Sequence, residues 1–86
     1  MHNLTYSPKA QKALKKFPKD YQLLIAKKIT QLKTDPKPRG FDKIAARIPP
    51  IYRIRAGDYR VFYFIDEDAK EVIIVDIKRR TNQTYR

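Results

Sequence analysis

The chain has 86 residues, of which 20 are Lys or Arg and 9 are Asp or Glu, so its formal net charge is +11. This length predicts one small domain, residues 1–86, and excludes an enzyme built from separate cofactor and substrate domains. No apolar run approaches the ~20 residues that span a bilayer, and no apolar core of a secretion signal is visible near the N-terminus. We therefore expect a cytoplasmic protein that does not associate with membranes.

The composition excludes several kinds of site. The sequence has no cysteine and a single histidine, His2. This excludes disulfides, thiolate nucleophiles, cysteine or multi-histidine zinc sites, and any Ser-His-Asp triad that does not use His2. Four of the nine acidic residues gather in one turn, 66–71, without calcium-loop spacing, and Gly40 and Gly57 stand alone rather than in a phosphate-binding loop. We expect neither a metal nor a cofactor.

The positive charge is divided unevenly along a chain that should fold. Hydrophobic residues make up 42%, with six Tyr and four Phe, so the chain is not a disordered basic tail. Lysine dominates residues 1–50 and arginine dominates residues 51–86. Because arginine grips phosphate with two parallel bonds, we expect the candidate site in the second part and a docking surface in the first. The charge favours a polyanion, with nucleic acid first, over a merely solvated basic surface.

The first 35 residues predict a short strand and two helices. Asn3–Tyr6 alternates polar and apolar residues, as a strand does. Ser7 and Pro8 are typical of an N-cap and of the first helical position, and Pro18 ends this helix and can begin another. The second helix ends before Pro36. Its apolar stripe consists of Tyr21, Leu24, Ile25, Ile29 and Leu32.

The remaining residues predict a long connection followed by a β-meander. Residues 35–50 hold four of the six prolines and read as the connection. Strands are expected over 51–56, 59–65 and 71–78, and Gly57-Asp58 suits a type II′ turn. The order predicts an α+β fold: an N-terminal strand, a helical hairpin and a three-stranded antiparallel meander, with the helices on one face of a four-stranded sheet.

The predicted turn fixes which residues face each other across the hairpin. Arg55 lies opposite Arg60, and Arg53 lies on the same face, away from the core. Like charges directly opposite are destabilising, and no acid is expected on that face, so an anion site is favoured over cations that simply extend into water. The opposite, core-facing side carries Tyr52, Ile54, Val61, Tyr63 and Ile65.

The hairpin Tyr52–Tyr63, with the sequence YRIRAGDYRVFY, resembles that of the RelE/ParE toxin superfamily, and the element order follows that family over essentially the whole chain. The resemblance implies a RelE-like, microbial-ribonuclease type of fold and a toxin of a type II toxin–antitoxin system. RelE-type members cut messenger RNA in the ribosomal A site by metal-free attack of a 2′-OH. ParE-type members share the fold, poison DNA gyrase and lack the ribonuclease residues.

The resemblance also implies catalytic positions. Arg53 and Arg55 stand where well-known RelE-type toxins have lysine. Since arginine does not give up its proton, these two, with Arg60, are expected to grip phosphate and stabilise transition-state charge. Tyr85 is expected to orient or deprotonate the 2′-OH and to stack on a base. Arg79, or Arg80 in a register shifted by one, is expected at the leaving 5′-oxygen.

The expected function is therefore a ribosome-dependent messenger endoribonuclease that inhibits translation. Its expected partners are the ribosome, messenger RNA and an acidic antitoxin that folds on binding. A ParE-like gyrase poison without nuclease activity and an inactive RNA-binding family member remain as alternatives. The residues expected to rest on RNA or the ribosome are Lys9, Lys12, Lys16, Lys19, Lys27, Lys78 and Arg80.

Overall fold

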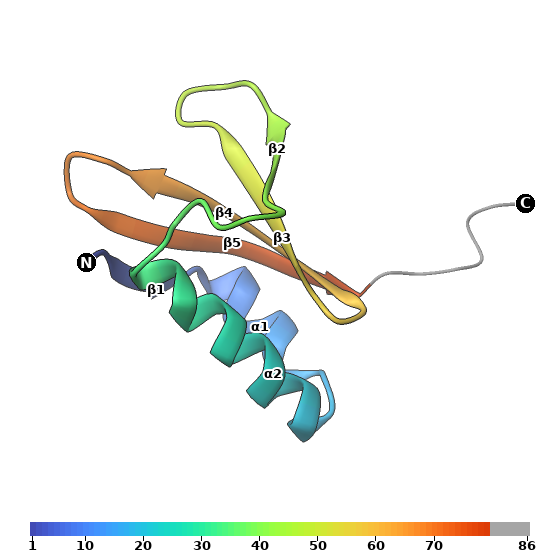
Figure 1. Ribbon diagram of the computed structural model, residues 1–86. Coiled ribbons are helices and arrows are strands. Elements are labelled where there is room, and N and C mark those ends of the chain that lie inside the picture. Colours follow the sequence, from blue (N-terminus) through green and yellow to red (C-terminus); the bar gives the residue numbers. More distant parts are fainter. Residues whose placement is uncertain (80–86) are drawn as a thin grey trace, which may run out of the picture.

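The computed structural model describes residues 1–79, which form two helices packed on one face of a mixed sheet (Figure 1). The sheet has five strands in the order β1-β5-β4-β3-β2, with β1 parallel to β5 and the other neighbours antiparallel. Neither helix is long and apolar enough to cross a membrane. The elements are β1 (Asn3–Tyr6), α1 (Pro8–Lys15), α2 (Lys19–Thr30), the 3-10 turn η1 (Gln31–Lys33), β2 (Asp42–Ala45), β3 (Ile51–Ala56), β4 (Tyr59–Asp66) and β5 (Glu71–Arg79).

Ser7 joins the start of α1 to the sheet. Its hydroxyl accepts a hydrogen bond from the Ala10 backbone N–H at 3.1 Å and donates one to the Val75 carbonyl at 2.7 Å. Pro8 follows at the first helical position, where a missing N–H costs nothing. The predicted cap is confirmed, and its second bond fixes α1 over β5.

We expect Ser7→Ala to lower the free energy of unfolding by about 1–2 kcal/mol, because it removes the cap bond and the bond to Val75. Urea unfolding followed by circular dichroism measures the change. Ser7→Thr keeps the hydroxyl and should retain most of the stability. Equal stability of the alanine variant and the wild type would show that these two bonds contribute nothing net.

The β3–β4 hairpin has the register that its turn predicts. Arg55 pairs with Arg60, and Arg53 pairs with Phe62. Gly57 has a φ of +62°, in the left-handed region that a type II′ turn requires at its first central position. A Cβ at Gly57 would also lie 3.3 Å from Leu24 on α2, so this tight turn is closely packed against the helix.

The prediction of four strands is wrong by one. Residues 42–45 form the edge strand β2, which pairs antiparallel with β3 and places Asp42 opposite Arg53. The strand is short and irregular in register, two of its four residues are charged, and its Ile44 is 45% exposed. It therefore lacks the alternation of buried residues by which a sequence signals a strand.

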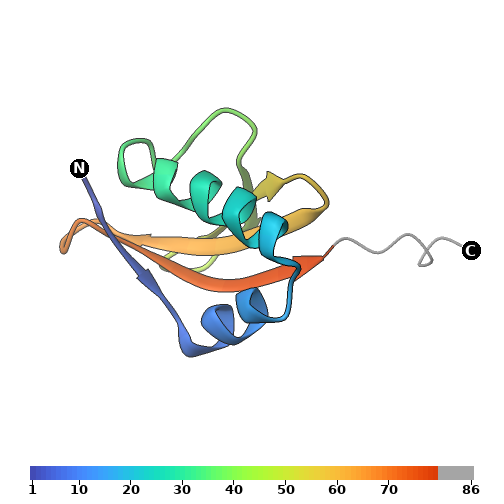
Figure 2. The ribbon, with the colours of Figure 1, turned by 90° about the horizontal axis from the view of Figure 1, so that it is seen from below.

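The core lies between the helices and the sheet. Figure 2, seen from below, shows α1 along β5 and α2 towards β3. Ile25 and Ile29 of α2 are fully buried, whereas Tyr21 and Leu24, expected in the same stripe, stay about two-fifths exposed. The buried hydrophobic residues are Ala10, Ile25, Ile29, Leu32, Tyr52, Ile54, Ala56, Tyr59, Val61, Tyr63, Ile65, Val72, Ile74 and Ile77.

Strand β5 contains one extra residue relative to β4. Phe62 pairs with Asp76, but its neighbour Tyr63 pairs with Ile74, so Val75 has no partner in the ladder. A bulge of this kind reverses the face of every later side chain relative to strict alternation. The reversal decides which basic residues at the end of β5 join the arginine cluster.

Candidate anion-binding site

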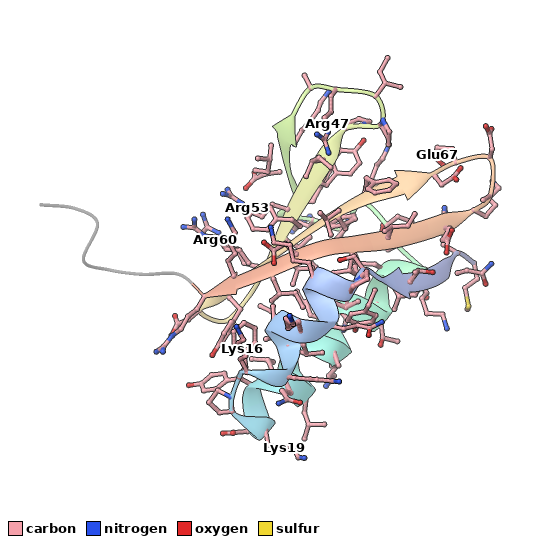
Figure 3. All side chains as sticks on the ribbon, turned by 180° about the vertical axis from the view of Figure 1, so that it is seen from behind. Lys16, Lys19, Arg47, Arg53, Arg60 and Glu67 are labelled. Atoms are coloured by element: carbon pink, nitrogen blue, oxygen red, sulfur yellow. The ribbon has the colours of Figure 1, made fainter. Side chains whose placement is uncertain are left out.

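Four cations gather on the sheet face opposite the helices, and we name Arg53, Arg55, Arg60 and Lys78 the cationic row. Arg55, Arg60 and Lys78 are successive cross-strand partners on β3, β4 and β5, and Arg53 lies two residues from Arg55 on β3. Figure 3 labels Arg53 and Arg60 side by side, while Lys16 and Lys19 lie at the helical end of the molecule. Like charges in one row repel, so the face is disposed to bind an anion.

The expectation that no acid lies on this face is wrong. The Asp42 carboxylate accepts a hydrogen bond from Arg53 at 2.6 Å, with side chains that are 49% and 21% exposed respectively. Asp76 also belongs to this face through its pairing with Phe62. The missed strand β2 supplies the first acid and the β5 bulge supplies the second. Arg53 is therefore held in place, while no ion pair to Arg55, Arg60 or Lys78 occurs within residues 1–79.

Two donors in the cationic row are unused. The Nε atoms of Arg53 and Arg60 are buried and have no hydrogen-bond partner in the described part of the chain. A buried donor without a partner costs about 1–3 kcal/mol, and more when charged, so native proteins keep few of them. An anion that turns the two guanidinium groups towards itself would relieve this cost.

Arg79 does not join the row. Its cross-strand partner on β4 is Tyr59, a core residue. The Tyr59 ring packs against that of Phe17, with the ring centroids 4.5 Å apart. Arg79 therefore belongs to the helix-facing side of the sheet, whereas Lys78 faces the same side as Arg60. Arg80 and Tyr85, the other two positions expected near the chain end, lie outside the described residues.

The lysines expected to form a docking surface lie on the helices. Lys12 on α1, Lys16 at the C-cap of α1, and Lys19 and Lys27 on α2 are exposed. Lys9 differs, because its ammonium lies 3.5 Å from the Asp76 carboxylate, which brings the start of α1 to the edge of the cationic face. Apart from Lys9, these helix lysines thus form a surface separate from the cationic row.

Phe62 is the main residue of this face that sequence reasoning left without a role. It is half-buried and directly opposite Arg53, and the Lys78 ammonium lies 5.9 Å from its ring centroid. The sequence contained a signal for this position, because Arg60 and Phe62 are two residues apart on one strand and so share a face.

Within residues 1–79, no group of three or more His, Cys, Asp or Glu residues could hold a metal ion.

Comparison with known proteins identifies the family. Residues 4–84 match the sequence profile described as the ParE toxin of the type II toxin-antitoxin system, parDE. The chain belongs to this family. It is thus a toxin of a type II toxin–antitoxin system, and the resemblance of its hairpin to the RelE/ParE superfamily is confirmed. None of the curated proteins matches the toxin's sequence significantly.

Solved structures support the same superfamily. A chain of the archaeal RelE–RelB complex from Pyrococcus horikoshii OT3 is 27% identical with a TM-score of 0.82, over 94% of the toxin and 97% of that chain. A chain of the RelBE2 toxin–antitoxin complex from Mycobacterium tuberculosis is 21% identical with a TM-score of 0.80, over 92% of the toxin and 98% of that chain. The isolated E. coli RelE toxin is 16% identical with a TM-score of 0.80, over 98% of the toxin and 89% of that chain. The last two likenesses concern the fold alone.

Proposed function

We propose that this toxin is an endoribonuclease that cuts messenger RNA on the ribosome by metal-free attack of a 2′-OH. The observation that carries the proposal is the cationic row, in which Arg53 and Arg60 keep buried Nε donors that have no partner among residues 1–79. A phosphodiester supplies the acceptors that these donors lack. The similarity to an archaeal RelE at 27% identity also supports a RelE-like activity. Action on translation would place the toxin in the cytoplasm.

The proposed chemistry removes one proton, adds one proton, forms one P–O bond and breaks another. The ribose 2′-oxygen loses its proton and bonds to the adjacent phosphorus, while the bond from phosphorus to the 5′-oxygen breaks and that oxygen gains a proton. The products are a 2′,3′-cyclic phosphate and a free 5′-OH. Extra negative charge develops on the phosphate oxygens in between, and fixed guanidinium groups stabilise it more than they stabilise the substrate.

The residues divide these tasks. Arg53, Arg55 and Arg60 bind the phosphate, and Tyr85 orients or deprotonates the 2′-OH. The leaving oxygen needs a cation on the same face. Because the β5 register turns Arg79 to the other side, we assign this position to Lys78, whose ammonium can give up a proton as arginine cannot. Without a strong acid–base pair, the free toxin should cleave slowly, and positioning by the ribosome should supply much of the rate.

An antitoxin is the proposed protein partner. The similar chains from Pyrococcus horikoshii and Mycobacterium tuberculosis come from toxin–antitoxin complexes. A net charge of +11 favours an acidic antitoxin segment that folds on binding. The exposed lysines of α1 and α2 are the proposed contacts to ribosomal RNA, and such contacts weaken steeply as salt rises.

A second candidate function is poisoning of DNA gyrase by protein binding, without nuclease activity. The observation that favours it is the family match itself, which is to the ParE toxin rather than to a RelE profile. The lysine-to-arginine changes at positions 53 and 55 are compatible with it. In this case the cationic row would be a binding surface.

Cleavage on programmed ribosomes tests the first function against the second. Purified toxin is added to ribosomes that hold a defined A-site codon, and to the same RNA alone with EDTA, and cuts are mapped by primer extension. The double variant Arg60→Ala, Tyr85→Phe is the inactive control. Lys70→Asn controls for loss of one charge, because Lys70 is exposed in the turn between β4 and β5, away from the helices and the cationic row, and asparagine tolerates its φ of 55°. A parallel assay follows supercoiling by DNA gyrase.

The two functions give opposite results. Cuts within the A-site codon that disappear in the double variant, with gyrase unaffected, are the result we expect. An intact message together with trapped gyrase–DNA complexes would replace the ribonuclease by the gyrase poison. If neither target responds, the toxin is an inactive, RNA-binding member of the family.

A comparison of Lys78→Ala with Arg79→Ala tests the register of β5. We expect the lysine variant to lose about tenfold or more in cleavage rate and the arginine variant clearly less, because only Lys78 faces Arg60. Single-turnover cleavage on programmed ribosomes gives both rates. A larger loss of rate in Arg79→Ala than in Lys78→Ala would mean that the last residues of β5 rearrange on the ribosome.

A further inference from the structure

A hollow of about 260 Å³ lies beside the cationic row, on the same face of the sheet. Its lining comes from α1, from the loop between β2 and β3, and from β3, β4 and β5. The charged and aromatic side chains of the lining are Lys9, Arg47, Phe62, Asp76 and Lys78. Figure 3 labels Arg47 on the same side of the sheet as Arg53 and Arg60. The roles proposed so far use only Lys9 and Lys78 from this lining.

Phe62 presents an unpaired aromatic ring there. The aromatic rings of the core pack against one another, as Tyr52 does against Phe41 and Tyr63, but Phe62 contacts no other ring within residues 1–79. It is only half-buried, and the Lys78 ammonium lies 5.9 Å from its ring centroid. A partly exposed ring between cations, on the face opposite the core, is suited to stacking on a planar ligand.

The hollow attracts anions even though it contains a carboxylate. Three cations and one carboxylate give a formal charge of +2, since 3 − 1 = 2. The Asp76 carboxylate is already engaged, because one oxygen accepts the Ile77 backbone N–H at 2.8 Å and the other lies 3.5 Å from Lys9. Arg47 and Lys78 therefore remain for a negatively charged ligand.

We propose that this hollow binds the RNA nucleotide next to the phosphate held by Arg53 and Arg60, with its base stacked on Phe62. Phe62 is directly opposite Arg53 and two residues, about 7 Å, along β4 from Arg60, which is one nucleotide step from the gripped phosphate. Arg47 and Lys78 contact the backbone of that nucleotide. Because every base has a π-face, the subsite positions the strand and does not select a sequence. The inference rests on the proposed RNA substrate.

Cleavage kinetics of Phe62 variants provide the first test. Phe62→Leu keeps an apolar side chain and should lower the cleavage rate on programmed ribosomes about 5- to 150-fold, the loss expected for one base–aromatic stack. Phe62→Tyr keeps the ring and should stay within about threefold of the wild type. Phe64→Leu is the matched control, because Phe64 is half-buried on the same strand and face but lies outside the hollow. Its rate should not change.

Direct binding provides a second test that does not require cleavage. An RNA trimer with 2-aminopurine on a central 2′-deoxyribose cannot be cut at that position, and stacking quenches its fluorescence. We expect quenching by the wild type, by Phe62→Tyr and by Phe64→Leu, and its loss with Phe62→Leu. If the wild type fails to cut messenger RNA but this quenching still depends on Phe62, the proposed nuclease function fails and the base subsite stands.

Two results would overturn the subsite. One is cleavage and quenching by Phe62→Leu at wild-type levels while the variant remains folded by circular dichroism. The other is Phe62-dependent binding of a Glu-rich peptide with no binding of the trimer, which would assign the hollow to an acidic protein segment.

Discussion

Replacing Arg60 by methionine should lower messenger cleavage about 10²- to 10³-fold while leaving the toxin as stable as before, or slightly more stable. Arg60 lies between Arg55 and Lys78, and its Nε donor is buried without a partner in the described structure. Loss of one fixed donor to a developing oxyanion typically has this effect on rate. Relief of like-charge contacts adds up to about 1 kcal/mol to the free energy of unfolding.

Methionine is the informative substitution, because it keeps the apolar stem that arginine packs on the sheet and removes only the charged end. Single-turnover cleavage and urea unfolding are measured on the same preparation. Arg60→Lys should recover part of the rate, since it restores charge without the planar fork. A large loss of stability in Arg60→Met would contradict this account and give the guanidinium a structural role.

Replacing Tyr63 should have the largest effect on folding. Tyr63 is fully buried in the central strand β4, its ring centroid lies 5.7 Å from that of Tyr52, and its hydroxyl donates a hydrogen bond to the Pro36 carbonyl at 2.7 Å. We expect Tyr63→Ala to lower the free energy of unfolding by about 3–5 kcal/mol, a large part of what a small domain has. Tyr63→Phe removes only the hydroxyl and should cost about 1 kcal/mol.

Alkaline titration separates the two contributions of Tyr63. Burial, with the nearby Tyr52 and Asp35 charges, raises the pKa of the Tyr63 phenol well above its ordinary value of about 10. The folded state thus keeps the neutral phenol, so its contribution to stability is complete below about pH 10 and is lost as the pH rises further. Chemical unfolding between pH 8 and 11 should show this loss in the wild type and a smaller one in Tyr63→Phe. Tyr21→Phe, at an exposed ring, is the matched control.

Local signals made the hairpin and the first helix predictable. A two-residue turn that begins with Gly57 allows one register, and that register alone brings Arg55 opposite Arg60. Ser7 and Pro8 mark a helix start through groups in their own side chains and backbone. In both cases the chemistry that decides the structure is contained in two or three neighbouring residues.

The site was harder to predict, because two non-local features complete it. Strand β2 exists only through its pairing with β3, so the Asp42 partner of Arg53 had no local signal. The bulge at Val75 lies in a run of four apolar residues, 72–75, where every residue suits either face. Alternation therefore could not reveal that Lys78, and not Arg79, faces Arg60.

The pairing of β1 with β5 affects the stage of synthesis and folding at which the toxin can first act. Ser7 bonds to Val75, 68 residues further along, and Asn3–Tyr6 has Glu71–Ile74 as its partner in the sheet. Pairings between such distant segments close large loops and slow the folding reaction. Lys78 meets Arg60 only when β5 joins β4. A nascent chain that ends before β5 therefore carries most of the positive charge but lacks Lys78 from the cationic row. If the proposed site is correct, we expect toxicity only once β5 completes the sheet.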